Sequence, residues 1–255
     1  MGTIAVTGAA GGIGRATCTR LEADGHRVIG VDVRDADVIA DLRDAAGRAA
    51  MLDGVARACE GGLHGVIAGA GVMGDDPDVV SINYFGAIAT LDGLRPLIAQ
   101  SGGGAAIAIS SNSTTTQPGL PNALVDVILS GDEEAARDAV PRNRGNAYAA
   151  SKLALARWVR HHAVTSDWIG AGVQLNAIAP GLIHTPMTVN DVDWIMNLGD
   201  VFPVPIGRPG KPDEIASLLA YLCSPDATFF CGSVIFVDGG TDAATRADDW
   251  PAPRA

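Results

Sequence analysis

Tyr148 and Lys152 form the most specific pair of reactive side chains in this sequence. The chain has two lysines against sixteen arginines, and one lysine follows a tyrosine by four positions in Tyr148-Ala149-Ala150-Ser151-Lys152. In a helix this spacing puts both side chains on one face. An ammonium about 4 Å from a phenol supplies the roughly 4 kcal/mol that would lower the phenol pKa from 10 toward 7. The pair therefore predicts a tyrosine that takes a proton from an alcohol or returns one to a carbonyl.

A glycine-rich loop, TGAAGGIG at residues 7–14, lies between a short apolar run and an amphipathic segment. Backbone N–H groups at such a strand-to-helix turn can bind a pyrophosphate. Taken alone, the loop could equally be a turn that packs a helix on a strand. Asp32 ends the next apolar run, at the distance where a ribose-binding carboxylate is expected. The combination predicts dinucleotide binding.

Asp32 also bears on the choice between NAD and NADP. A carboxylate at the ribose would repel the 2′-phosphate of NADP by up to about 4 kcal/mol at an effective dielectric near 20. Arg34 could pair with that phosphate, so NADP stays open as the less favoured cofactor. We expect NAD.

Apolar runs alternate with helix-length segments along the chain, which predicts a parallel sheet covered on both faces. The expected strands are residues 3–7, 27–32, 63–68, 105–110, 173–179 and 233–237, and the expected helices are 13–24, 44–59, 79–100, 147–169 and 212–223. We therefore expect one α/β domain over residues 1–255, a Rossmann-type doubly wound parallel sheet. Too few residues separate 27–32 from the apolar run 38–40 for a crossover helix, so that edge of the sheet should be truncated.

Two segments interrupt this alternation, at about residues 112–145 and 184–205. We expect both to be insertions over a substrate cleft at one end of the sheet. The second carries apolar side chains that include Met187 and Trp194, the expected substrate contacts, and no cluster of Arg or Lys for an anionic substrate. A steroid or another apolar alcohol or ketone fits such a cleft. The alternative is that these side chains pack the loop itself or form a subunit contact.

Composition excludes several other classes of protein. A net charge of -11 argues against a nucleic-acid surface and against binding to anionic membranes. The four cysteines form no CxxC pair, and the histidines have no metal-site spacing, so we expect neither disulfides nor a metal. No run reaches the roughly 18 apolar residues of a membrane span, and strand-like sequence begins at Thr3. We expect a cytoplasmic protein.

With these motifs in hand, the sequence resembles the short-chain dehydrogenase/reductase family along almost its whole length. The resemblance implies that Ser111 hydrogen-bonds the reacting oxygen and that Asn83 holds a water in a proton relay, beside Tyr148 and Lys152. It also implies a set of cofactor-binding residues: Gly8, Gly12, Ile13, Gly14, Asp32, Tyr148, Lys152, Pro180, Gly181, Ile183 and Thr185. Adjacent Gly11 and Gly12 let the loop match sugar-nucleotide epimerases too. About 100 residues after Tyr148 are too few for their larger C-terminal domain.

Residues 25–42 and the long gap between Ser111 and Tyr148 resemble the 3α-hydroxysteroid dehydrogenase/carbonyl reductase branch of that family. This likeness implies that Asp41 and Leu42 lie near the adenine, and Ala70 and Gly71 beside the adenosine ribose. We expect a homodimer or a homotetramer. A dehydrogenase for a terpenoid, diol or cyclic alcohol is the first alternative, and a non-catalytic dinucleotide-sensing regulator is the second. Residues 68–71 read AGAG where the family usually has NNAG, which puts one set of hydrogen bonds in doubt.

Overall fold

Seven parallel strands form one sheet in the order β3-β2-β1-β4-β5-β6-β7 in the computed structural model, which describes residues 1–143 and 145–249. The order confirms the predicted doubly wound α/β fold. The strands are β1 (Thr3–Thr7), β2 (Arg27–Asp32), β3 (Val38–Ile39), β4 (Gly65–Ala68), β5 (Gly104–Ile109), β6 (Val173–Pro180) and β7 (Val234–Val237).

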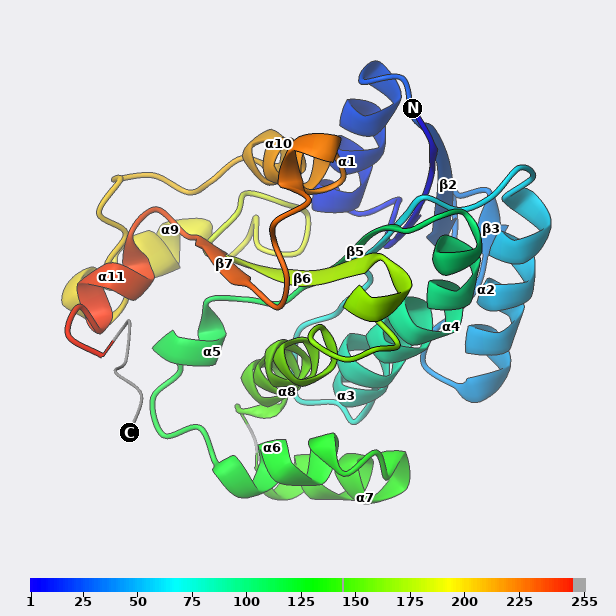
Figure 1. Cartoon of the computed structure of the whole chain (residues 1–255). Coiled ribbons are helices and arrows are strands. Elements are labelled where there is room, and N and C mark those ends of the chain that lie inside the picture. The colour runs from blue at the N-terminus through cyan, green and yellow to red at the C-terminus, as the bar shows by residue number, and fades with distance from the viewer. Residues whose placement is uncertain (144, 250–255) are drawn as a thin grey trace.

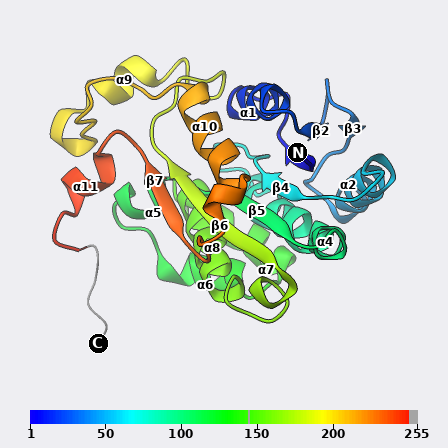
Figure 2. The same ribbon diagram turned by 45° about the horizontal axis from the view of Figure 1, so that its top comes forward.

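Helices cover both faces of the sheet (Figure 1). Helices α1 and α10 pack together on one face (Figure 2), while α2, α4 and α8 lie on the other. The helices are α1 (Gly12–Ala23), α2 (Ala45–Ala58), α3 (Asp78–Val80), α4 (Ala87–Gln100), α5 (Ser113–Thr116), α6 (Asn122–Leu129), α7 (Glu133–Ala139), α8 (Ala147–His162), α9 (Val192–Met196), α10 (Pro212–Leu222) and α11 (Thr241–Thr245). None of the helices among the described residues combines the length and apolarity needed to span a membrane.

Alternate residues of the central strands build two separate cores. In β1, Ile4 and Val6 join the core under α1 and α10, while Ala5 joins the core under α2, α4 and α8. In β5, Ile107 and Ala106 divide in the same way. Successive strand side chains point to opposite faces, so a strand covered on both sides is apolar throughout. These runs were therefore recognisable in the sequence.

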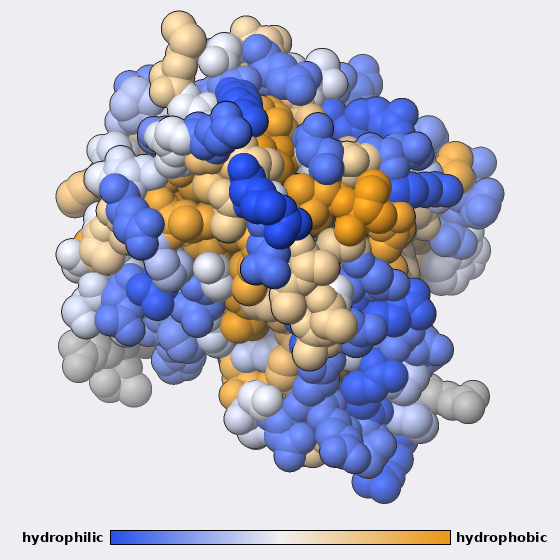
Figure 3. Space-filling view, turned by 90° about the vertical axis from the view of Figure 1, so that its right-hand side faces the viewer, coloured by the Kyte–Doolittle hydropathy of each residue, from blue (hydrophilic) through white to orange (hydrophobic). Residues whose placement is uncertain are grey.

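The sheet edge at β3 is truncated, as the short connection predicted. β3 pairs with β2 at only two positions, and no helix lies between the two strands. The Asp37 carboxylate instead accepts a hydrogen bond from the Gly30 N–H at 2.8 Å. Figure 3 shows hydrophobic residues between hydrophilic ones on this side of the molecule. Val33 and Ile39, which are both large and apolar, are exposed. The Asp37 side chain therefore accepts a hydrogen bond from β2 that a longer β3 would otherwise accept through its backbone.

Only part of the first insertion lies near the carboxyl ends of the strands. Helix α5 follows directly after β5, but α6 and α7 pack against α8 and α3 on the outer side of the helix layer (Figure 1). Residue 144 of this insertion lies outside the described residues. Helix α8 ends at His162, seven residues before the predicted end, and residues 163–168 form turns that lead to a short 3-10 helix, Ile169–Ala171.

Asn83 lies in a π-helical turn, Ser81–Gly86, that joins α3 to α4 in one continuous helical run. Such wide turns inside α-helices are frequent at functional sites because they re-aim a side chain. Asn83 is fully buried here. The π-turn therefore gives the Asn83 amide a direction that a regular α-helix would not give it.

Candidate active site

The glycine loop requires glycine at two positions, at one for the backbone conformation and at the other for close packing. Gly8 has φ +75°. A Cβ on Gly14 would lie 2.0 Å from the Gly8 carbonyl oxygen, so α1 can begin this close to β1 only without a side chain there. The loop presents its N–H groups at the amino end of a twelve-residue helix. This arrangement fits a pyrophosphate.

Asp32 lies at the end of β2 and faces this loop. Its carboxylate accepts hydrogen bonds from the N–H groups of Ala10 at 3.0 Å and Val33 at 2.7 Å. These bonds fix the carboxylate beside the glycine loop, where the sequence placed a ribose-binding acid. Arg34 lines the same cleft.

A cleft of about 470 Å³ runs from the glycine loop to the second insertion. Most of the predicted cofactor residues line it: Gly8, Gly12, Ile13, Gly14, Asp32, Asp41, Leu42, Ala70, Gly71 and Thr185. Of the predicted cofactor residues further along the chain, Ile183 lines a separate cavity of about 110 Å³, and Gly181 packs against Asp238. The cleft also takes in residues that were not predicted to bind the cofactor, and all of them are close chain neighbours of predicted site residues: Ala10, Gly11, Val31, Val33, Arg34, Ala40, Gly69, Val72, Ile82 and Pro186.

Thr7 supplies hydrogen bonds to the segment after β4. Its hydroxyl accepts from the Gly69 N–H at 3.1 Å and from the Ala70 N–H at 3.2 Å. The threonine is fully buried at the end of β1, directly beside β4. The AGAG sequence therefore still has a side-chain acceptor that fixes this wall of the cleft.

Lys152 and Tyr148 lie together on the first turns of α8, and the Lys152 nitrogen faces Gly71 in the wall of the cleft. The Lys152 side chain is 5% exposed, and its ammonium lies 5.8 Å from the centre of the Tyr148 ring. The same ammonium donates to the Ile109 carbonyl oxygen at 2.8 Å, and the Ser110 hydroxyl donates to the Lys152 carbonyl oxygen. Lys152 is therefore buried and held against the end of β5, and Tyr148 beside it is partly buried.

Ser111 and Asn83 reach the same place from β5 and the π-turn. The Ser111 side chain is hydrogen-bonded to Tyr148. The Asn83 amide oxygen accepts from the Val72 N–H at 2.8 Å, and its NH₂ group donates to the Val72 carbonyl oxygen at 2.9 Å. A Cβ on Gly71 would lie 3.2 Å from the Asn83 oxygen and 3.3 Å from the Lys152 nitrogen, which places both groups against one small space. Helix α8, the end of β5 and the π-turn thus bring the predicted residues together.

Comparison with known proteins decides the family. A 3-alpha-hydroxysteroid dehydrogenase/carbonyl reductase of Comamonas testosteroni is 40% identical over 96% of this chain and 98% of its own length. The chain belongs to the short-chain dehydrogenase/reductase family. It is an oxidoreductase of that family.

Further similarities agree with this assignment. The 3-alpha-hydroxysteroid dehydrogenase of Pseudomonas sp. B-0831, solved with NADH, superposes with a TM-score of 0.85 at 40% identity and covers 96% of this chain and 99% of its own. A cis-4-hydroxycyclohexanecarboxylate dehydrogenase of Sinomonas cyclohexanicum is 31% identical over 93% of this chain and 95% of its own length. Family models described as enoyl-(acyl carrier protein) reductase and as NAD dependent epimerase/dehydratase match residues 129–242 and 4–179. These matches support a nicotinamide dinucleotide as the cofactor.

Burial dominates the pKa values of the two central groups of this dehydrogenase/reductase. It raises the pKa of Tyr148, and the hydrogen bond with Ser111 offsets only part of this rise. Burial also lowers the pKa of Lys152 to about 8. Burial therefore opposes the lowering of the phenol pKa that the sequence predicted from the ammonium.

The low pKa of Lys152 predicts a pH dependence of the enzyme's stability. The folded state releases the proton near pH 8 and the unfolded chain near 10.5, so the unfolded state holds more protons between these values and stability rises with pH. Compared with Lys152→Met, the wild type should gain about 3 kcal/mol in free energy of unfolding across this window. Urea unfolding of both proteins at pH 7.5, 9 and 10 measures it. A difference that is constant with pH would contradict the buried ammonium.

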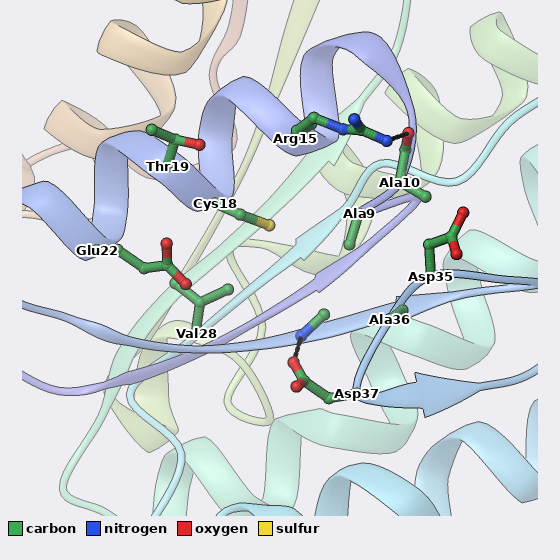
Figure 4. Close-up of a pocket in the computed structure, with 11 residues that line it drawn as sticks. Ala9, Ala10, Arg15, Cys18, Thr19, Glu22, Val28, Asp35, Ala36 and Asp37 are labelled. Carbon is green, nitrogen blue, oxygen red and sulfur yellow. Dashed lines mark hydrogen bonds between the residues drawn. The ribbon is translucent and has the colours of Figure 1, made fainter.

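A second, larger cavity of about 640 Å³ lies beside α1 (Figure 4). The flank of α1 and the β2–β3 connection line it, where a fold of this type has a crossover helix. Arg15 donates to the Ala10 carbonyl oxygen there. Because the loop glycines and Asp32 line the smaller cleft, whose Gly71 faces the Lys152 nitrogen, we assign the cofactor there.

The two predicted substrate residues differ in their surroundings. Met187 lines the dinucleotide cleft and is half exposed. Trp194 lies on the short helix α9 and is 66% exposed. Its contact with substrate stays a prediction.

Proposed function

We propose that the chain is an NAD(H)-dependent enzyme that interconverts a secondary alcohol and a ketone on an apolar substrate, as a 3α-hydroxysteroid dehydrogenase/carbonyl reductase does. The observation that carries this proposal is the buried ammonium of Lys152 beside the Tyr148 ring, with Ser111 hydrogen-bonded to the phenol. The similarity to the Comamonas testosteroni protein supports the choice of substrate class.

In this proposal each side chain handles a proton or a charge. Tyr148 takes the proton from the substrate hydroxyl during oxidation and returns it to the carbonyl oxygen during reduction. Ser111 donates a hydrogen bond to that oxygen. Lys152 stabilises the phenolate, and Asn83 holds a water that leads the proton away. The bound dinucleotide supplies the hydride acceptor or donor and, when oxidised, a positive charge beside the phenol.

We infer NAD as the preferred cofactor from the anchored Asp32 carboxylate. Asp32→Asn should raise the ratio of kcat/KM with NADP to that with NAD by roughly 10²-fold, because a repulsion of a few kcal/mol is removed. Steady-state kinetics with both cofactors measures the ratio. Asp35→Asn is the matched control, since Asp35 is an exposed acid on the same connection. Wild-type kcat/KM with NADP equal to that with NAD would refute the inference.

A panel of ketones, followed by NADH absorbance, tests the substrate class. We expect kcat/KM for 3-oxosteroids to exceed that for small polar ketones, because apolar area buried in the cleft contributes about 25 cal/mol per Å². The Sinomonas cyclohexanicum relative makes a simple cyclic alcohol the second candidate. Equal efficiency on bulky apolar and small polar ketones would contradict an apolar cleft. That the enzyme is cytoplasmic and works as a homodimer or homotetramer stays a prediction from the sequence.

A further inference from the structure

The wall of the cleft at the expected adenine end is a short irregular segment. Asp41 and Leu42 line the cleft between β3 and α2. The truncated sheet edge gives this segment little support, since β3 makes two ladder pairs and its last backbone bond runs from the Ala40 N–H to the Asp32 carbonyl oxygen at 2.9 Å. Something other than the sheet must therefore hold the carbonyl groups that follow.

Arg48, on the first turns of α2, supplies that support. Its Nε donates to the Leu42 carbonyl oxygen at 2.9 Å, and its Nη2 donates to the Arg43 carbonyl oxygen at 3.1 Å. The side chain is 11% exposed, and the guanidinium lies 5.9 Å from the centre of the Phe85 ring. The planar fork of donors can hold two carbonyl groups only while its plane keeps this orientation.

Glu133 fixes the plane of that fork from a distant part of the chain. Its two carboxylate oxygens accept from Nη1 at 2.7 Å and from Nη2 at 2.5 Å. Glu133 begins α7 in the first insertion, 85 positions from Arg48. Burial acts to raise the pKa of Glu133, but hydrogen bonds from Arg48 and Ser81 and the charges of Arg48 and Arg137 hold it below its usual value. The carboxylate is therefore charged at neutral pH and neutralises the guanidinium.

We propose that Glu133, acting through Arg48, positions the adenine wall of the cofactor cleft, so that the first insertion supports dinucleotide binding from outside the cleft. The inference rests on the proposed cofactor site. Both residues are positioning residues, because neither lines the cleft. Without the Glu133 charge, a nearly buried guanidinium would lose its counter-ion and turn toward water, which would release the Leu42 carbonyl group.

A second ionic contact joins the same elements but is more exposed. Arg43 pairs with Asp78 at 3.3 Å, and Asp78 pairs with Arg137 of α7 at 2.8 Å. Side-chain exposures of 54%, 28% and 37% make these pairs weak. The Arg48–Glu133 pair is therefore the one to test.

Glu133→Gln should weaken binding of NADH and of ADP-ribose by about the same factor, near fivefold, because a charge-assisted bidentate contact becomes a neutral one. The kcat at saturating NADH should not change. Neither should kcat/KM with reduced nicotinamide mononucleotide, which has no adenine. NADH fluorescence titration, competition by ADP-ribose and NADH or mononucleotide oxidation measure these quantities. Combined with Arg48→Met, Glu133→Gln should add no further loss, since it acts through that arginine.

Glu134→Gln is the matched control, because Glu134 is an exposed carboxylate on the same helix and should leave all these values unchanged. An unchanged affinity of Glu133→Gln for ADP-ribose would overturn the inference, as would an equal loss with the mononucleotide. If Glu133→Gln does not fold, Glu133→Asp, whose shorter carboxylate withdraws from Arg48, should show the same selective loss. A wild type that binds neither NADH nor ADP-ribose would refute the proposed cofactor site itself.

Discussion

Tyr148→Phe should lower kcat by about 10³-fold and leave the affinity for NADH within about twofold of the wild type. The substitution removes one hydroxyl and keeps the ring that packs beside Lys152. The proton then has no acceptor near the reacting oxygen, while the glycine loop and Asp32 remain in place. Ketone-dependent NADH oxidation and NADH fluorescence titration measure the two quantities.

Tyr221→Phe is the control for the loss of a phenol elsewhere. Tyr221 is exposed on α10, and its hydroxyl makes one long contact of 3.4 Å to the Asp226 carbonyl oxygen. Its kcat should equal that of the wild type. If Tyr148→Phe kept more than a tenth of the wild-type kcat, Tyr148 could not be the main proton carrier. If the wild type bound NADH and oxidised none with any ketone, the chain would be the dinucleotide-sensing regulator.

Lys152→Met should lower kcat by about 10²-fold. A unit charge 5.8 Å from the phenol ring is worth about 3 kcal/mol to a phenolate at an effective dielectric near 20. The methionine keeps the length and apolar stem of the side chain but loses the ammonium and its bond to the Ile109 carbonyl oxygen. Initial rates at saturating substrate and cofactor measure the loss.

Lys211→Met is the natural control, because Lys211 is the second of the chain's two lysines and is exposed before α10. It should retain full activity. Equal kcat values for Lys152→Met and the wild type would show that the ammonium does not act on the phenol. A loss confined to KM for the cofactor would instead make Lys152 a binding residue only.

Local sequence predicted those parts of the fold in which burial is uniform. The boundaries of β1 and β2 are confirmed, since each is an apolar run bounded by glycine or an acid. Helix α6 was not predicted, because LVDVIL at residues 124–129 has the β-branched content of a strand. Its helical form becomes evident only where Leu124, Val125 and Ile128 are buried on the side packed against α8.

In the candidate site, too, local sequence predicted some features and missed those that depend on tertiary packing. The spacing in the chain predicted the Tyr148–Lys152 pair, and the position after a strand predicted Asp32. The direction of the Tyr148 pKa shift could not be predicted, because it depends on burial by segments far apart in sequence. The contact between Arg48 and Glu133 spans 85 positions and has no local signal. Interactions set by tertiary packing were therefore the ones that the sequence did not reveal.

The pKa of Tyr148 in the complex with NAD⁺ tests the central claim most directly. Ultraviolet titration of the wild type minus that of Tyr148→Phe isolates this phenol from Tyr84 and Tyr221. We expect saturating NAD⁺ to bring the pKa from above its ordinary value of 10.0 into the neutral range, and we expect the shift to be lost in Lys152→Met. A Tyr148 that stays protonated beyond pH 10 with NAD⁺ bound would contradict the account.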